Sequence, residues 1–95
     1  MIDTLSKQDF TALAPGSITL DHQAQQFTFS VVESRDLPPI SPRLTPFAIV
    51  LQGPAKPVLQ QGIYALIHPQ HGQLDLFIVP ISSNAEHTKY EIIFN

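Results

Sequence analysis

Apolar and polar residues alternate along most of the chain, a period of two that is typical of half-buried β-strands. The alternation is strict in Gln26–Val31, where Phe27, Phe29 and Val31 face one way. Further alternating or apolar segments are Ser17–Leu20, Phe47–Leu51, Ile63–His68, Leu74–Ile81 and Tyr90–Phe94. The polar residues Asp21–Gln25 fit a hairpin turn between the first two strands. About six short antiparallel strands therefore predict a mainly β fold, a small barrel or roll.

One segment near the N-terminus departs from the period of two and predicts a short helix over about residues 7–13. Ser6 and Asp9 are three residues apart and fit an N-cap with a capping box. Phe10 and Leu13 would share the buried face of this helix, and a proline-glycine pair stops it. The helix is expected to cover part of the sheet.

Leu76–Val79 is apolar at successive positions and would be apolar on both faces of its strand. We expect this strand to be central, or to be covered on its second face by the helix or by another subunit. Together with the low charge content, this pattern leads us to expect a homo-oligomer.

The chain has 95 residues, of which 43% are hydrophobic and 14% charged, which predicts one globular domain spanning residues 1–95. The formal net charge is -3 and no basic run occurs, so a nucleic-acid partner is not expected. The absence of cysteine excludes disulfides, thiolate metal sites and a cysteine nucleophile.

The first residues lack the basic and apolar regions of a signal peptide, and the longest apolar run, Phe47–Leu51, is far too short to span a bilayer. A cytoplasmic protein without membrane contact is therefore expected. Export without a signal peptide, or as part of a particle, stays open.

Six of the nine prolines lie between Leu37 and Pro57, so we expect a stiff Pro-rich loop over about residues 34–46, beside a strand. This loop combines two arginines with apolar residues, a combination enriched at protein interfaces. Its rigidity also lowers the entropic cost of binding. The expected interaction surface consists of Arg35, Leu37, Ile40, Arg43 and Leu44. The alternative is that the apolar residues fold back onto the barrel.

His68 and His71 are three residues apart and are the candidate metal ligands. Pro69 and Gly72 instead favour a hairpin turn, and spacing suggests no third ligand. His22 and His87 are remote in sequence. We therefore expect no metal site.

The sequence contains no recognisable catalytic motif. No serine lies in a Gly-x-Ser-x-Gly context, and the four isolated glycines form no phosphate-binding loop. Four carboxylates could pair in space as acid and base, but nothing favours one pair over solvated strand faces; they are Glu33, Asp36, Asp75 and Glu91. The expectation is a protein that is not an enzyme and holds no cofactor.

The C-terminal third carries a distinctive pattern, QGxYxLxHPxxGxLxLFxVP over Gln61–Pro80, followed by YExxFN over Tyr90–Asn95. This pattern resembles a family of small bacterial domains of unknown function, about a hundred residues long. The resemblance implies an all-β roll without assigned catalytic residues. It also implies an assembly or accessory role, because such domains occur beside proteins with phage-tail-collar-like domains.

These observations predict a non-catalytic protein-interaction or assembly module with a protein partner, associated with a phage-tail-like or other multiprotein assembly. The alternative is a small-molecule-binding β-barrel, because a closed sheet can hold a ligand between sheet and helix.

Overall fold

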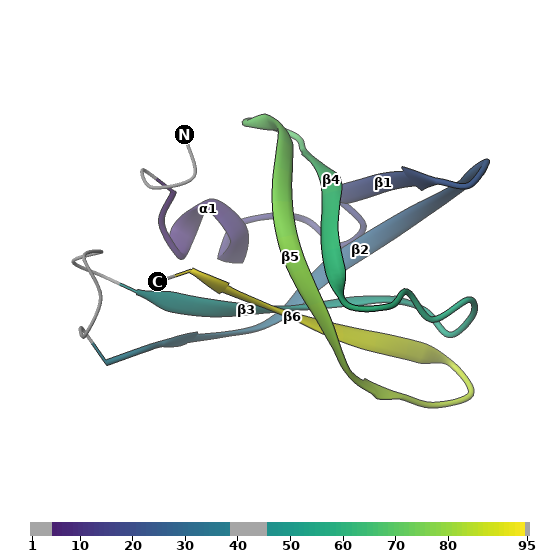
Figure 1. Cartoon of the computed structure of the whole chain (residues 1–95). Helices are drawn as coiled ribbons and strands as arrows, with labels where there is room; N and C mark the ends of the chain where they lie inside the picture. Colours follow the sequence, from purple (N-terminus) through teal and green to yellow (C-terminus); the bar gives the residue numbers. More distant parts are fainter. Residues whose placement is uncertain (1–4, 39–45, 95) are drawn as a thin grey trace.

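A computed structural model describes residues 5–38 and 46–94 of the chain, which form one short helix and six strands (Figure 1). The elements in chain order are α1 (Gln8–Thr11), β1 (Ile18–His22), β2 (Gln25–Asp36), β3 (Phe47–Pro54), β4 (Gly62–His68), β5 (Gly72–Ser83) and β6 (His87–Phe94).

All strand pairs are antiparallel, and the strands close into a barrel in the order β1-β2-β3-β6-β5-β4. The predicted mainly β fold of about six strands with a short helix is confirmed. The closure is uneven, because β1 and β4 share a single register pair, Thr19 with Ile67, whereas β3 and β6 are paired from Phe47–Phe94 to Pro54–His87.

The helix is shorter than the predicted span of residues 7–13 and makes a single turn. The helix ends before the predicted proline-glycine stop, with Ala12 as its C-cap. Gly16 lies beyond this end, with a φ of +76° and an N–H that donates to Ser30 Oγ at 2.9 Å. Phe10 is the buried residue of the helix, as predicted, whereas Leu13 lies beyond the helix end and is partly buried against the core.

Two residues, Gln23 and Ala24, form the turn between β1 and β2, both with positive φ, 50° and 65°. This backbone suits a tight hairpin, whose twist matches that of the flanking strands. The usual residues for such a turn are asparagine and glycine, so the sequence predicted the hairpin from its polarity but carried no signal for the turn type.

The strand β2 extends to Asp36. Residues 34–36, which the sequence predicted as the start of a loop over residues 34–46, therefore belong to the strand. The prediction failed here because the register between β2 and β3 shifts between Val31 and Glu33, and this bulge interrupts the alternation of residue types. A hydrogen bond from Leu37 N–H to Pro46 O, 2.9 Å long, joins the two ends of the loop.

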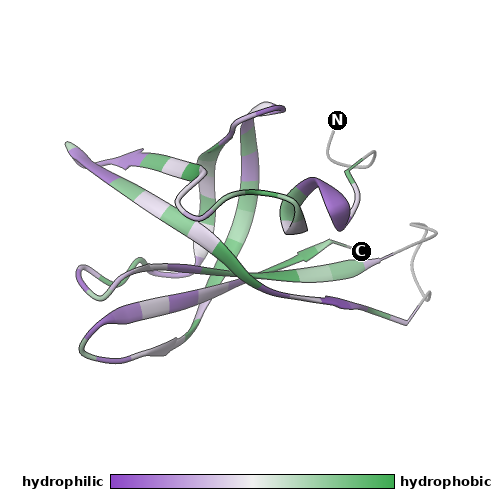
Figure 2. Ribbon diagram, turned by 180° about the vertical axis from the view of Figure 1, so that it is seen from behind, coloured by the Kyte–Doolittle hydropathy of each residue, from purple (hydrophilic) through white to green (hydrophobic). Residues whose placement is uncertain are grey.

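A cluster of buried hydrophobic side chains occupies the interior of the barrel. Hydrophobic and hydrophilic residues alternate along the strands, most clearly along β2 (Figure 2). The largest fully buried side chains are Tyr90, Phe10, Phe29, Phe47, Ile49, Leu51, Leu66, Ile78, Ile92, His68 and Thr88. The strand β3 is buried on both faces from Phe47 to Leu51. A ligand between sheet and helix would therefore have to displace core side chains.

A second bulge lies in β5, where the register with β6 shifts between Pro80 and Ser82. Proline has no N–H to donate to a neighbouring strand, and a bulge is one of the places in a sheet where it is tolerated. The tight turn predicted between His68 and Gly72 is also present, and Gly72 has the expected positive φ of 73°.

Candidate functional site

Arg35, the first residue of the predicted interaction surface, lies in β2 and forms an ion pair with Glu91 of β6, with 2.6 Å between Nη2 and Oε2. The two strands flank β3, so the pair lies across the outer face of β3. Ala48 and Val50 are buried there, next in register to Arg35 and Glu91. The guanidinium already has a partner within the chain.

The rest of the predicted interaction surface is only partly placed. Leu37 follows β2 and is half-buried. The other three residues, Ile40, Arg43 and Leu44, lie outside the described residues. The Pro-rich loop therefore stays a prediction as an interaction surface.

His68 is buried at the end of β4, and its ring joins the turn to α1. Nδ1 accepts hydrogen bonds from the N–H groups of Gln70, at 3.0 Å, and His71, at 3.2 Å. Nε2 lies 2.7 Å from the carbonyl oxygen of Asp9. Both ring nitrogens are thus engaged within the chain, and a metal ion at either would have to displace these bonds.

The neighbouring His71 approaches the side chain of Asp9, with 3.2 Å between Nε2 and Oδ1. Asp9 also accepts from the N–H of Ser6 at 2.8 Å, which is half of the predicted capping box. The Ser6 N–H hydrogen bond, followed by His71, holds the pKa of Asp9 below its ordinary value despite the opposing effect of burial. No group of three or more His, Cys, Asp or Glu side chains arranged for a metal occurs within residues 5–38 and 46–94.

The hydroxyl of Ser6 bonds to Asp9 and not to an imidazole, so this cluster lacks the nucleophile-to-base order of a catalytic triad. Two of the carboxylates singled out from the sequence, Glu33 and Glu91, lie on different strands with β3 between them. Glu91 pairs with Arg35, and Val50 of β3 stands between it and Glu33 in the register.

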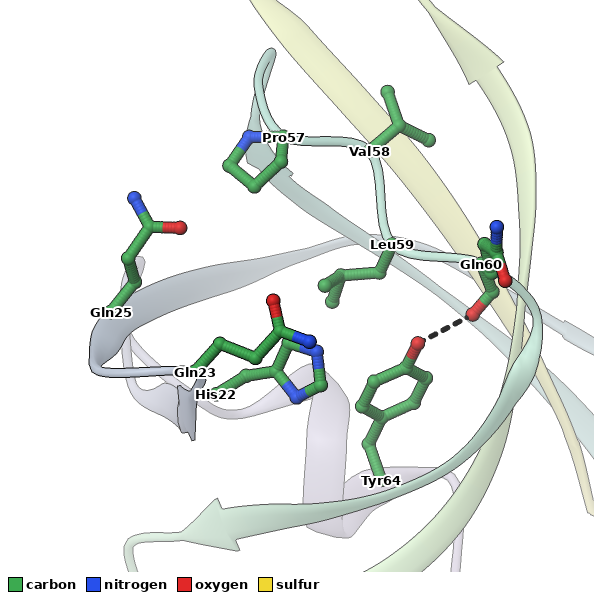
Figure 3. Close-up of a pocket in the computed structure, with 8 residues that line it drawn as sticks. All are labelled: His22, Gln23, Gln25, Pro57, Val58, Leu59, Gln60 and Tyr64. Atoms are coloured by element: carbon green, nitrogen blue, oxygen red, sulfur yellow. Dashed lines mark hydrogen bonds between the residues drawn. The ribbon is translucent and has the colours of Figure 1, made fainter.

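A pocket of about 310 Å³ lies at one end of the barrel, between the β1–β2 turn and the segment that leads into β4 (Figure 3). Its lining residues are His22, Gln23, Gln25, Pro57, Val58, Leu59, Gln60 and Tyr64. The rings of His22 and Tyr64 meet edge to face at 5.3 Å, and the Tyr64 hydroxyl donates to Gln60 O at 2.7 Å. His22 and Tyr64 lie on β1 and β4, beyond the one register pair that joins these strands.

The floor of this pocket is tied to the core. Leu59 is buried, and its N–H donates to the hydroxyl of Tyr90 at 2.9 Å. Burial raises the pKa of Tyr90, which keeps the phenol neutral. The pocket carries amide, imidazole and phenol groups but no carboxylate, lysine or arginine. Its titratable side chains are therefore the imidazole of His22 and the phenol of Tyr64, whose rings are in contact.

The outer face of the β4–β5 hairpin is an apolar surface that the sequence indicated only through the two-sided pattern of Leu76–Val79. Ile63 and Phe77 are register partners on this face, 72% and 51% exposed. Ile67 adds a third exposed apolar side chain. The helix does not cover this face, because its buried residue, Phe10, packs inside the barrel.

A carboxylate lies in the middle of this apolar face. Asp75 is the register partner of Ala65, between the pair Ile63–Phe77 and the pair Ile67–Gln73. Its Oδ1 accepts a hydrogen bond of 3.2 Å from the Gln73 side chain, and none of the ion pairs among the described residues includes it. We call Ile63, Ile67, Asp75 and Phe77 the β4–β5 face.

No helix in the described part of the chain is long and apolar enough to cross a membrane.

Comparison with known proteins places the chain in a family. Neither a curated protein nor a solved structure matches this chain. A family model described as a domain of unknown function, DUF6916, matches residues 5–94. This agrees with the resemblance noted in the C-terminal third, and the chain belongs to the DUF6916 family.

Proposed function

We propose that the protein is a non-catalytic interaction module that binds another protein through the β4–β5 face. The observation that carries the proposal is the exposed pair Ile63 and Phe77 on a barrel whose core is already filled. Neither side chain contributes to the core. Exposing their apolar surface to water is unfavourable and adds nothing to the stability of the fold. Burial against a partner accounts for their position.

The charge at the centre of the face indicates which kind of partner it fits. A symmetric dimer through this face would bring two copies of Asp75 together near its centre, and facing like charges oppose association. The whole chain is also acidic, with a net charge of -3. The face therefore fits a different protein, one that presents a lysine or arginine flanked by apolar side chains.

Site-specific photocrosslinking in the cells that produce the protein tests this function. A photoreactive phenylalanine replaces Phe77 in one variant and Val32, an exposed residue of the β2 bulge, in the control. We expect one discrete crosslinked protein at position 77, absent at position 32, and lost when Asp75→Lys is added. Asp21→Lys, which changes another exposed carboxylate, should leave the product in place.

Affinity measurements with the identified partner give the size of the effect. Removing an aromatic residue at an interface centre costs about 2 kcal/mol or more, so Phe77→Ser should weaken binding by about thirtyfold or more. Crosslinks only between copies of this chain, equal products at both positions, or none at all would refute the proposal. In the last case, a thermal-shift screen for ligands of the pocket around His22 and Tyr64 would be the next experiment.

A further inference from the structure

The ring of His68 is held in one protonation state by its hydrogen bonds. Two backbone N–H groups, those of Gln70 and His71, point at Nδ1, so this nitrogen carries no proton. Nε2 must then carry the proton that it donates to Asp9 O. The ring is neutral, is only 1% exposed, and bonds to both α1 and the β4–β5 turn.

A second proton cannot be added to this ring without breaking the arrangement. A proton on Nδ1 would face the two N–H groups that now donate to it, and both would lose their acceptor in a buried site. The ring would have to turn or leave, and its bond to Asp9 O would be lost with it. This bond is one of the contacts between α1 and the barrel.

Charged and aromatic groups near the His68 ring also affect how α1 is held on the barrel. Asp9 of α1 and His71 of the turn form an ion pair when His71 is protonated, and this pair also joins α1 to the turn. Lys7, the N-cap residue of α1, forms an ion pair with Asp36 of β2 at 3.0 Å. In the described part of the chain, β3 and β6 contribute the rings of Phe47 and Phe94, which pack against Phe10, and β5 begins with a glycine opposite His68.

We propose that His68 is a proton-sensitive latch: the neutral imidazole holds α1 on the barrel, and its protonation releases α1. The release uncovers the aromatic cluster of Phe10, Phe47 and Phe94, whose rings lie 4.6 to 6.3 Å apart. The Asp9–His71 pair opposes the release, but it is partly exposed and therefore weaker than the buried hydrogen bonds that protonation breaks.

Native-state hydrogen exchange at pH 7.5 and 5.5 tests the latch, read at the backbone amides of residues 70 and 71. A free histidine has a pKa of about 6.5, so a ring that is protonated only after release should lower these protection factors about tenfold over this range. The experiment uses His71→Gln, which removes the opposing ion pair. The amide of Ile49 in β3 is the internal reference and should keep its protection.

His68→Asn is the matched variant, because its side-chain oxygen can accept from the Gln70 N–H but does not titrate in this range. In the His71→Gln background it should make the protection of the Gln70 amide independent of pH, while His87→Asn should leave the tenfold change intact. A change that persists in His68→Asn, or no change in His71→Gln, would overturn the latch.

If His68→Asn does not fold, ring nitrogen shifts of His68 in the otherwise native chain decide the question. The latch requires that protonation of the ring and loss of protection at Gln70 occur together. A ring that becomes doubly protonated while this amide stays protected would contradict it.

Discussion

Gly53 lies near the end of β3 against the ring of Phe29, which is fully buried and packs edge to face on Tyr90. A Cβ at position 53 would lie 2.7 Å from two atoms of that ring. Such a distance is far shorter than a van der Waals contact, and the ring has little room to move in a filled core. The glycine is required here by close approach and not by its backbone angle.

Gly53→Ala should therefore lower the free energy of unfolding by about 1–3 kcal/mol, the usual cost of overpacking a core. Gly62→Ala in β4 is the control, because a Cβ there would come no closer than 3.8 Å to Tyr64. Gly62→Ala should leave the free energy of unfolding unchanged or raise it by up to about 1 kcal/mol, because alanine restricts the conformations of the unfolded chain. Urea denaturation of both variants measures the difference, and equal values would argue against the close approach.

The short helix α1 depends on Asp9, whose carboxylate accepts from the Ser6 N–H and pairs with His71. Because these contacts lower the pKa of Asp9 in the folded state, they stabilise the fold above the ordinary pKa of about 3.8. The stabilisation is lost as the pH falls through the lowered pKa. Asp9→Asn should thus cost about 0.5–1 kcal/mol near pH 6 and almost nothing near pH 2.

Asp36→Asn serves as the comparison for this helix, since it removes the ion pair with Lys7 from an exposed site. Exposed pairs contribute little, so its effect should stay below about 0.5 kcal/mol at either pH. Chemical denaturation at the two pH values gives both numbers. An Asp9→Asn penalty that persists at the lower pH would show that the loss is not electrostatic.

The elements differ in how well the sequence predicts them. Alternating or apolar segments located the cores of all six strands, and Phe10 located the buried side of the helix. The end of β2 was missed because the extra residue Val32 breaks the period. The partner of Arg35 was missed because Glu91 is 56 positions away, and a pairing across β3 depends on strand order, which the local pattern does not contain.

The candidate site was predicted less well than the fold. Phe77 was recognised only as part of a two-sided strand, because exposure depends on what lies over a face in three dimensions. His68 was considered as a metal ligand or a turn residue. Its bonds to Gln70 and His71 are local, but its contact with Asp9 joins segments that are 59 positions apart.

The barrel closes between β1 and β4, the neighbouring strands with the fewest register pairs. Only Thr19 and Ile67 are register partners there, and the two strands diverge toward the pocket. Few backbone hydrogen bonds have to break for this junction to open, so local opening should begin there.

Amide hydrogen exchange of the whole chain checks this expectation. The amides of β1 should have protection factors at least tenfold lower than those of Ile49 to Leu51, which are buried in a strand paired on both sides. Protection in β1 equal to that in β3 would mean that the barrel opens only by unfolding completely.

The burial of β3 on both faces also has a consequence for the unfolded chain. The segment from Phe47 to Leu51 is uncharged, apolar and rich in branched residues, which is the composition of segments that stack into amyloid-like fibrils. Pro46 and Pro54 stand at its two ends, and proline interrupts the hydrogen-bond ladder of such fibrils. Aggregation during refolding is therefore expected to start from this hidden strand, and the two prolines limit how far it can spread along the chain.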